Sequence, residues 1–491
     1  MPAFPIYTTS AMRKLEELAA PASGTLMERA GAAAAEFARS LCGDTAKAVL
    51  VVAGPGNNGG DAFEVAAHLR RWFFRVSVVF SGERDKLPED AQAALGKWEA
   101  AGGTLLHDVP GEPRFDLAVD GLFGTGLKRP LAGTHGTLVE KLNALGVPIL
   151  AIDVPSGIDA DTGAIMGCAV RASHTVTFIA HKPGLLTLDG PDHCGELKLD
   201  TLGLDPVRLL EPEGMLLDAD ILGRAIRPRP SNFHKGQAGS VAVLGGAAGM
   251  VGAALIAGRA ALKCGAGRVY LGLLTPRPPY IDYTQPELML RKPKELLERG
   301  VVDVLVAGPG MGKADPARRL LAAALAAPVP VVLDADALNM IAASRALAAS
   351  LAKRKMATIL TPHPAEAGRL LGLTTGGVQA DRIASARALA QRYRSSVVLK
   401  GNGSVIAAPD GKFWINPSGN PGMASAGMGD ALAGMIAALV AQGADPLQAL
   451  LAGVYLHGAA ADALVASGLG PAGITASEVI DRARVLLNRR S

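Results

Sequence analysis

Short runs of apolar residues alternate with helix-like patterns along most of the chain. Residues 48–53 (AVLVVA) form a continuous apolar run, which is typical of a parallel strand covered on both faces. A glycine-rich loop follows, then a predicted helix over 61–71 and a second strand-like run at 75–80. This alternation predicts an α/β domain with a parallel sheet. The remaining strand-like runs of the first series lie at 117–120, 148–153 and 174–178.

A second series of the same kind begins after the proline-rich stretch 227–230 (RPRP). Residues near 205–225 carry prolines and acidic residues, a composition that fits a linker. We therefore expect two α/β domains, 1–215 and 216–491, and the length of 491 residues agrees with more than one domain. The strand-like runs of the second series lie at 240–244, 302–306, 330–334 and 396–400.

Composition excludes several classes of protein. Hydrophobic residues make up 49% and charged residues 19%, so the chain has ample surface to bury and is not disordered. The net charge of +4 is spread without a basic stripe, so no nucleic-acid partner is expected. The four cysteines are far apart, which favours neither a disulfide framework nor a zinc site. Without a secretory pattern or a run of ~18 apolar residues, we expect a cytoplasmic protein with no membrane partner.

The first candidate site is the segment 54–61 (GPGNNGGD), between a predicted strand and a predicted helix. Its glycines fit GxGxxG, so a dinucleotide-binding dehydrogenase is one alternative, since glycines let backbone N–H groups approach a pyrophosphate. Asp61 is expected at the helix start, where its carboxylate would compete with a phosphate for the positive end of the helix dipole. An ordinary helix-terminal charge is the other interpretation of Asp61. The two consecutive asparagines indicate side-chain contacts as well.

Further oxygen-bearing side chains follow strand ends in this domain. Asp120 and Asp153 each end a predicted strand, and Ser156 follows Asp153 closely. Ligands of open α/β sheets bind at the carboxyl ends of the strands, so we expect these side chains to converge with Asn58. Each one alone is more often a cap or turn residue. Oxygen ligands without histidine or thiolate favour an alkali or alkaline-earth ion over zinc.

The second domain has a glycine-rich segment, 420–430 (NPGMASAGMGD), before an apolar helix predicted over 431–440. A glycine turn that opens a helix offers unpaired backbone N–H groups to an anion. Asp430 could accept a proton from a substrate hydroxyl beside that anion site. A normally capped helix is the alternative. His363 lies between two prolines in an extended segment, which is compatible with a binding or a structural role.

In the first domain the motifs GNNGGD (56–61), VDGLFGTGL (119–127) and AIDVPSGID (151–159) resemble those of the NAD(P)H-hydrate epimerase family. The resemblance implies a Rossmann-like three-layer fold, potassium bound by Asn58, Asp120 and Ser156, and Asp153 as the catalytic residue at the reacting ring. The family often has glycine after the motif's aspartate, where this chain has Ala62. The residues implied to hold the hydrated cofactor are Asn57, Asn58, Gly59, Gly60, Asp61, Gly124, Thr125, Gly126, Leu127, Lys128, Arg129, Pro130 and Asp153.

In the second domain GMGD (427–430) resembles the GxGD signature of ribokinase-like kinases. Together with KGQAG, LGG, GPGMG, LDADAL, TPHPAE and KG, it is similar to the NAD(P)H-hydrate dehydratase family, which implies a ribokinase-like α/β fold. The resemblance implies Asp430 as the catalytic base. The implied substrate contacts are Ala253, Gly310, His363 and Asp430, and the implied nucleotide contacts are Lys400, Gly401, Asn402, Gly403, Ser404 and Gly429.

The two resemblances together cover nearly the whole chain and imply one bifunctional activity. The first domain would interconvert the R and S forms of NADHX and NADPHX, and the second would dehydrate the S form at the expense of ADP, giving AMP and phosphate. The implied cofactors are K⁺ and Mg²⁺, and the implied assembly is a homo-oligomer. ADP is implied because the fused arrangement resembles the bacterial members. A small-molecule kinase with an accessory domain, and a catalytically silent binding module as the first domain, are the alternatives.

Overall fold

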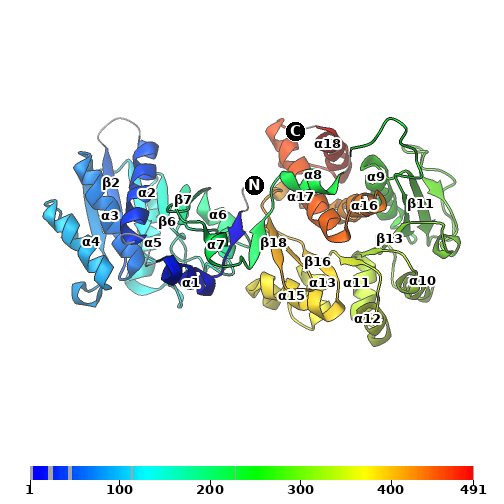
Figure 1. Cartoon of the computed structure of the whole chain (residues 1–491), viewed down its shortest axis with the longest axis horizontal. Helices are drawn as coiled ribbons and strands as arrows, with labels where there is room; N and C mark the ends of the chain where they lie inside the picture. Colours follow the sequence, from blue (N-terminus) through cyan, green and yellow to red (C-terminus); the bar gives the residue numbers. More distant parts are fainter. Residues whose placement is uncertain (1–3, 20–25, 43–46, 112–113, 227, 490–491) are drawn as a thin grey trace. The chain divides into compact units, whose positions relative to one another are not determined.

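The computed structural model describes residues 4–19, 26–42, 47–111, 114–226 and 228–489. It divides into two compact units, Met1–Met215 and Leu216–Ser491 (Figure 1). Each unit is built around its own sheet. In both, most consecutive parallel strands are joined through helices, so the expected α/β class is confirmed.

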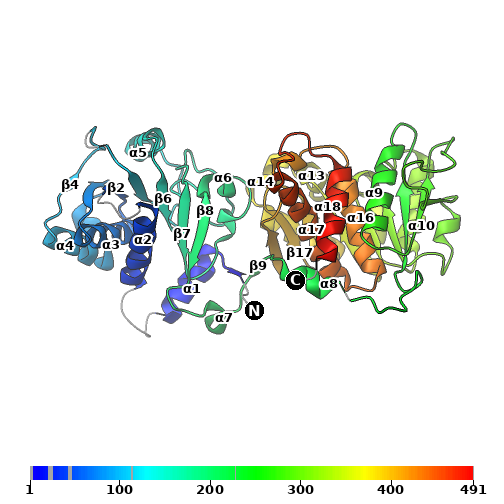
Figure 2. The same ribbon diagram turned by 90° about the horizontal axis from the view of Figure 1, so that it is seen from above.

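The first unit has a parallel sheet in the order β4-β3-β2-β5-β6-β7-β8. Alternate residues of the central strand β2 point to opposite faces, so Val49 and Val51 pack against α1–α4 and Leu50 and Val52 against α5. Figure 2 shows α5 and the α2–α4 group on opposite sides of the sheet. The strands are β2 (Ala48–Ala53), β3 (Arg75–Phe80), β4 (Leu105–Leu106), β5 (Leu117–Gly121), β6 (Ile149–Ile152), β7 (His174–Phe178) and β8 (Glu196–Asp200).

This unit is therefore a three-layer arrangement with helices on both faces of a buried parallel sheet. A short strand, β1 (Pro5–Ile6), pairs antiparallel with β9 (Gly214–Leu216). The helices of the unit are α1 (Thr9–Ala19), α2 (Leu26–Cys42), α3 (Asn57–Arg71), α4 (Glu89–Ala100), α5 (Gly133–Ala144), α6 (Gly190–Cys194) and α7 (Pro206–Leu209).

The prediction that a loop extends to Asp61 was wrong. Helix α3 begins at Asn57, so Asp61 is its fifth residue and does not occupy the helix start. The physical reason is close packing, because a Cβ at Gly59 would lie 2.0 Å from the carbonyl oxygen of Gly54. The glycines thus let the first turn of the helix lie against the backbone of the strand–helix connection. Ala62 is fully buried in the continuous helix, so the departure from the family pattern does not interrupt it.

The sheet of the second unit runs in the order β18-β17-β16-β15-β14-β13-β10-β11-β12. Its strands are parallel from β16 to β12, and β16, β17 and β18 form an antiparallel meander at one edge. The strands are β10 (Ser240–Gly245), β11 (Arg268–Leu273), β12 (Met289–Leu290), β13 (Val304–Ala307), β14 (Val331–Leu333), β15 (Thr358–Leu360), β16 (Ser396–Leu399), β17 (Ser404–Ala407) and β18 (Phe413–Asn416).

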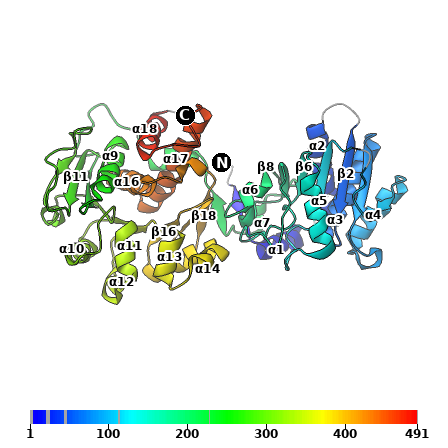
Figure 3. The same ribbon diagram turned by 180° about the vertical axis from the view of Figure 1, so that it is seen from behind.

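Helices cover both faces of this second sheet. The helices α8, α9, α16, α17 and α18 lie on one face and α10–α13 and α15 on the other (Figures 1 and 3). The helices are α8 (Asp220–Ala225), α9 (Val251–Lys263), α10 (Asp315–Ala326), α11 (Ala335–Ala342), α12 (Arg345–Ala352), α13 (Pro364–Leu371), α14 (Thr375–Ala380), α15 (Arg382–Tyr393), α16 (Met428–Ala441), α17 (Pro446–Ala466) and α18 (Ala476–Asn488).

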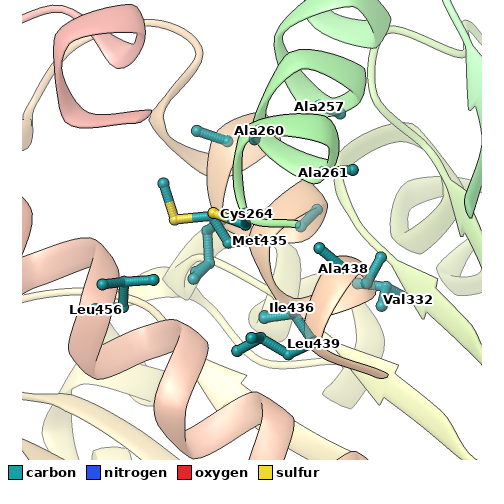
Figure 4. Close-up of a cluster of buried hydrophobic side chains, with 14 of the residues drawn as sticks. Ala257, Ala260, Ala261, Cys264, Val332, Met435, Ile436, Ala438, Leu439 and Leu456 are labelled. Carbon is teal, nitrogen blue, oxygen red and sulfur yellow. The ribbon is translucent and has the colours of Figure 1, made fainter. Parts of the chain in front are cut away.

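The core of the second unit is centred on α16, which packs on the sheet and against α9 and α17. Figure 4 shows Met435 of α16 beside Cys264, which follows α9, and Ala438 of α16 beside Val332 of β14. The small residues permit close approach, since a Cβ at Gly434 would lie 2.1 Å from the carbonyl oxygen of Ala257. Helix α17 has the length and apolar composition of a membrane span, but 67% of that apolar window is buried within the fold. That burial is typical of a core helix.

We expect Met435→Ala to lower the free energy of unfolding of the second unit by about 2–5 kcal/mol, because it leaves a cavity in a closely packed core. Met435 is fully buried. Met356→Ala is the matched control, since Met356 is 39% exposed and its truncation should change stability by about 0.5 kcal/mol or less. Thermal and urea unfolding measure both variants. Equal effects would contradict this description of the core.

Candidate active sites

The first site lies where β2, β5 and β6 end. Asp120, near the end of β5, is fully buried, and its Oδ1 accepts a 2.6 Å hydrogen bond from Ser156 Oγ. Its Oδ2 accepts a 2.8 Å hydrogen bond from the backbone N–H of Ser156. Burial raises the pKa of Asp120 to about 6, although the hydrogen bonds from Ser156 and Leu122 lower it. A carboxylate is thus held in an apolar environment by neutral donors.

Asn58 brings a third polar side chain to this edge of the sheet, from the first turn of α3. It is buried, and within the described part of the chain its Nδ2 has no hydrogen-bond partner. Gly124, in the turn after β5, lies beside it, because a Cβ there would be 3.1 Å from Asn58 Oδ1 and 3.5 Å from Asp153 Oδ2. Asn58, Gly124 and Asp153 therefore meet in one place. The buried Asn58 Nδ2 can therefore donate to an acceptor on a bound molecule.

Asp153 follows β6 in a left-handed conformation, with φ +66°. For a residue other than glycine this conformation costs about 1–2 kcal/mol, so the surrounding structure must hold it. Its Oδ1 accepts a 2.5 Å ion-paired hydrogen bond from Lys182 Nζ, and Lys182 is almost fully buried. Sequence reasoning missed Lys182. The available signal was its position shortly after a strand, in the segment 181–184 (HKPG).

Two further acids lie around this pair. Burial, followed by the negative charge of Asp153, raises the pKa of Asp61 well above its usual value. Lys182 acts in the opposite direction and lowers this pKa. Burial and Asp153 also raise the pKa of Glu16 from α1. The site thus combines two acids of raised pKa with a carboxylate paired to a lysine, an arrangement suited to acid–base chemistry.

The remaining residues implied for this site lie in two segments. Asn57, Gly59 and Gly60 belong to the first turn of α3. The turn from Gly124 onward leads from β5 toward α5, and Leu127 N–H donates to Gly124 O in it. Its far end is exposed to solvent, at Gly126, Lys128, Arg129 and Pro130, while Thr125 and Leu127 are partly buried.

The second site forms around the start of α16. Gly427 has φ +88° and precedes the helix, which begins at Met428, three residues before the predicted start. Asp430 is therefore in the first turn, where backbone N–H groups have no acceptor within the helix. On one side, Asp462 of α17 accepts hydrogen bonds from Gly419 N–H and Asn420 Nδ2, which fixes the entrance to the glycine turn.

Three polar side chains, each directly after a strand, form a network beside this glycine turn. Asp334 follows β14, Thr361 follows β15 and Lys400 follows β16. Lys400 Nζ lies 3.0 Å from Asp334 Oδ1, and Thr361 Oγ1 donates to the same oxygen at 2.7 Å. A Cβ at Gly429 would lie 3.1 Å from Lys400 Nζ, so the lysine is immediately beside the helix N-terminus. A positive side chain and a positive helix end are thus combined.

The pKa of Asp430 is raised to about 7, first by burial and then by Asp334, Asp336 and Glu366, while Lys400 lowers it. A carboxyl group with a pKa near neutrality can accept a proton and later release it. Burial alone would lower the pKa of Lys400, but Asp334 and Glu366 raise it. The lysine is therefore charged.

The other implied residues lie around this network. A Cβ at Gly310, which has φ +54°, would be 3.2 Å from the Cβ of Ala253, so these two are neighbours. His363 caps α13, because its Nδ1 accepts from Ala365 N–H, and its Nε2 lies 3.3 Å from Glu366. A structural role for His363 is therefore present. The ring is also about half exposed, which leaves it accessible to a ligand.

Residues 400–403 form the turn between β16 and β17, and Ser404 Oγ donates to Gly401 O. The buried Arg382, which sequence reasoning missed, supports this turn. A Cβ at Gly401 would lie 2.7 Å from Arg382 Nη1, and Arg382 Nη2 donates to Leu399 O. Arg382 starts α15, and an arginine at a helix start carried no signal of this contact.

The fold and the two sites define a two-domain enzyme. Its first unit has an acidic, oxygen-lined site on a Rossmann-like sheet, and its second has a glycine turn, a lysine and a carboxylate on a ribokinase-like sheet. Two protein-family models match the chain, "YjeF-related protein N-terminus" over residues 23–184 and "NAD(P)H-hydrate dehydratase" over residues 241–482.

Close relatives span the whole chain. The bifunctional NAD(P)H-hydrate repair enzyme Nnr of Escherichia coli is 38% identical over 473 residues, covering 94% of this chain and 89% of that protein. The enzyme of the same name from Coxiella burnetii is 38% identical and covers 98% and 99%. The bifunctional NAD(P)H-hydrate repair enzyme of Leishmania braziliensis is 36% identical and covers 98% and 93%. The chain belongs to the family of bifunctional NAD(P)H-hydrate repair enzymes.

Solved structures match the second unit. The ADP/ATP-dependent NAD(P)H-hydrate dehydratase of Bacillus subtilis, co-crystallised with ATP/Mg²⁺, is 32% identical with a TM-score of 0.50, covering 56% of this chain and 98% of that one. A ribokinase-like superfamily protein of Enterococcus faecalis is 26% identical with a TM-score of 0.50, covering 56% and 96%. The expected ribokinase-like fold and the expected pairing of an epimerase with a dehydratase are confirmed.

We expect Asp334→Asn to lower the stability of the second unit by about 3 kcal/mol, because it leaves the charged Lys400 without its carboxylate partner. Asp334 is 2% exposed and Lys400 is 22% exposed. Asp410→Asn is the matched control, since Asp410 lies in an exposed turn and its Oδ1 accepts from Lys412 N–H, as an asparagine oxygen can. Thermal unfolding with a probe in the second unit measures both. An unchanged midpoint for Asp334→Asn would contradict the importance of this pair.

Proposed function

We propose that the two sites described above carry out the two reactions of the family on hydrated nicotinamide cofactors. The first unit interconverts R- and S-NAD(P)HX, and the second converts S-NAD(P)HX to NAD(P)H at the expense of ADP. The observation that carries this proposal is the presence in one chain of two carboxylate sites, each beside an ion-paired lysine at the carboxyl end of a parallel sheet. The alternative, a kinase with an accessory domain, would not explain the first of these sites.

In the first unit, the substrate is held by Asn57–Asp61 and by the turn from Gly124 to Pro130, and Asp153 contacts the reacting ring. Inversion at C6 requires the C6–N bond of the hemiaminal to open and re-form from the other face, and a carboxylate can take the C6 hydroxyl proton on opening and return it on closure. Support comes from the geometry, since Asp153 Oδ2 faces the position of Gly124. Asp61, whose pKa is raised by burial and then by Asp153, lies on the neighbouring helix.

We assign the K⁺ site to Asn58, Asp120 and Ser156. These residues offer amide, carboxylate and hydroxyl oxygens, and such oxygen ligands fit an alkali cation. The donors around Asp120 are neutral, so its negative charge lacks a balancing cation among them. A potassium ion would supply that positive charge and help to orient Asn58 and Ser156 at the edge of the substrate site.

In the second unit, Ala253, Gly310, His363 and Asp430 contact the hydrated ring and its dinucleotide. Lys400, the turn Gly401–Ser404 and Gly429 hold the nucleotide. Asp430 accepts the proton of the C6 hydroxyl as that oxygen takes the β-phosphoryl group of ADP, and AMP leaves. Phosphate then departs from C6 while C5 loses a proton, which restores the dihydronicotinamide. Lys400 and the amides at the start of α16 stabilise the negative charge of the transferring group.

We propose ADP as the phosphoryl donor, because the fused arrangement resembles bacterial members of the family. The Bacillus subtilis dehydratase is described as ADP/ATP-dependent, so the test compares ADP with ATP. Mg²⁺ would be held through the nucleotide's phosphates beside the glycine turn and would neutralise part of their charge. The partners are small molecules, NADHX, NADPHX and ADP, and we propose that the chain acts as a homo-oligomer.

Absorbance at 340 nm tests the proposal when the protein meets both NADHX epimers with ADP, Mg²⁺ and K⁺. We expect complete conversion to NADH by the unmodified chain. Asp430→Asn should slow dehydration by at least about 100-fold, the contribution of a general base. Asp153→Asn should stop the fast phase at the S-epimer fraction. Omission of K⁺ should slow only the R-epimer phase, and ATP should replace ADP poorly.

The same assay can overturn the proposal. An absence of any ADP-dependent gain in absorbance from either epimer would reject dehydration. A stable phosphorylated alcohol as product would instead establish the kinase alternative. Full conversion by Asp153→Asn would make the first unit a binding module.

The dehydratase should also depend on pH through Asp430. The base must be ionised, and its pKa is about 7, so kcat/KM for S-NADHX should rise about tenfold per pH unit below 7 and level off above it. Asp336→Asn removes one of the acids that raise this pKa, so the inflection should move to lower pH. Initial rates between pH 5.5 and 8.5 measure both. A flat profile, or an inflection unmoved by Asp336→Asn, would contradict the role of Asp430.

A further inference from the structure

Lys182 in the first unit is buried at a position where a lysine is energetically costly. Its side chain is 2% exposed. The Nζ atom is satisfied by three acceptors, Asp153 Oδ1 at 2.5 Å, Phe178 O at 2.8 Å and Thr177 Oγ1 at 3.0 Å. Removing an ammonium group from water costs several kcal/mol, and only such a complete set of partners offsets it. A packing role alone would be filled better by an apolar residue.

The contacts of Lys182 leave the two oxygens of Asp153 in different states. Oδ1 accepts from Lys182 Nζ and from Thr177 Oγ1, so it is fully occupied. Oδ2 is directed to the turn after β5, 3.5 Å from the position of a Cβ at Gly124. One oxygen is therefore held by the protein while the other faces the place proposed for the substrate.

The backbone keeps this carboxylate in place as well. Asp153 N–H donates to Val176 O at 2.7 Å, and φ is +66°. Burial and then Asp153 raise the pKa values of Glu16 on α1 and Asp61 on α3, while Lys182 and, for Glu16, Arg13 lower them. Lys182 supplies positive charge against this group of carboxyl groups.

We propose that Lys182 is a positioning residue of the epimerase reaction, which holds Asp153 Oδ1 so that Oδ2 is presented to the C6 hydroxyl of the hydrated ring. Lys182 acts through Asp153 and does not touch the substrate. The proposal rests on the proposed role of Asp153. It adds that the Lys182–Thr177 pair determines the orientation of the base and hence the rate of the chemical step.

The test measures interconversion of the purified NADHX epimers by chromatography, with ADP left out so that the second unit is idle. Lys182→Met should lower kcat for epimerisation by about 100-fold, the usual contribution of a positioned base, with KM changed by less than about 3-fold. Lys182→Arg keeps the charge and should retain more of kcat than Lys182→Met. Lys86→Met, at an exposed lysine of the same unit, should leave kcat unchanged.

Two further measurements separate positioning from loss of structure. Dehydration of pure S-NADHX should be unchanged in Lys182→Met, because the second unit is untouched. In an Asp153→Asn background, Lys182→Met should cause no further loss, because both changes remove the same function. Should Lys182→Met fail to fold, Thr177→Val is the milder variant, and it should lower kcat by about tenfold at unchanged KM, about 1.4 kcal/mol of barrier.

A folded Lys182→Met with kcat within about 3-fold of the unmodified chain would overturn the inference, as would a rise in KM alone. Unchanged kcat in Thr177→Val would overturn it too. If Asp153→Asn itself keeps full epimerase activity, the proposed role of Asp153 fails first. If Asp153→Asn is inactive and Lys182→Met is normal, only the positioning role fails.

Discussion

Both sites of this protein depend on one electrostatic arrangement, a lysine largely withdrawn from solvent and paired with the carboxylate that follows a parallel strand. Lys182 pairs with Asp153 in the first unit and Lys400 pairs with Asp334 in the second. Strands covered on both faces leave no place for charge along their length, so polar groups collect at their ends. There a lone charge would be unstable, and a pair with additional hydrogen bonds is tolerated. In each unit the threonine that joins the pair, Thr177 or Thr361, completes it.

The two pairs differ in which group remains available to a substrate. In the first unit the paired carboxylate is itself the proposed base, and one of its oxygens is kept for the substrate. In the second unit Asp334 accepts a hydrogen bond from Lys400 and holds it in place, and a separate acid, Asp430, is the proposed base. The lysine of the second unit lies beside the amides of α16 and can therefore meet an anion. The same pairing thus orients a base in one unit and an anion-binding group in the other.

Much of the fold could be predicted from the sequence because continuous apolar runs mark parallel strands. The runs at 48–53, 75–80 and 174–178 are strands β2, β3 and β7 at those positions, and the other runs differ from their strands by one or two residues at an end. The start of α3 was missed because consecutive glycines and asparagines are typical of loops. Only the packed structure shows that Gly59 is required for a helix in contact with Gly54.

Some polar residues of the sites could be predicted from the sequence and others could not. Acids at strand ends could be found because a parallel sheet brings such ends together. Lys182 and Arg382 could not be predicted as site residues. Each contacts its partner through a tertiary interaction that leaves no pattern in the local sequence. Lys182 follows a later strand than Asp153, and Arg382 supports a turn that comes seventeen residues or more after it along the chain.

The network of Asp334, Thr361 and Lys400 has a consequence for folding. These residues follow three successive strands, β14, β15 and β16, and the helix that completes the site begins only at Met428. Contacts between residues so distant in sequence form late, since the connecting chain must first be closed. The anion-binding centre is therefore complete only when β14, β15, β16 and α16 have all come together. Recovery of dehydratase activity during refolding would report the last step of assembly of the unit, after its helices have regained their circular dichroism.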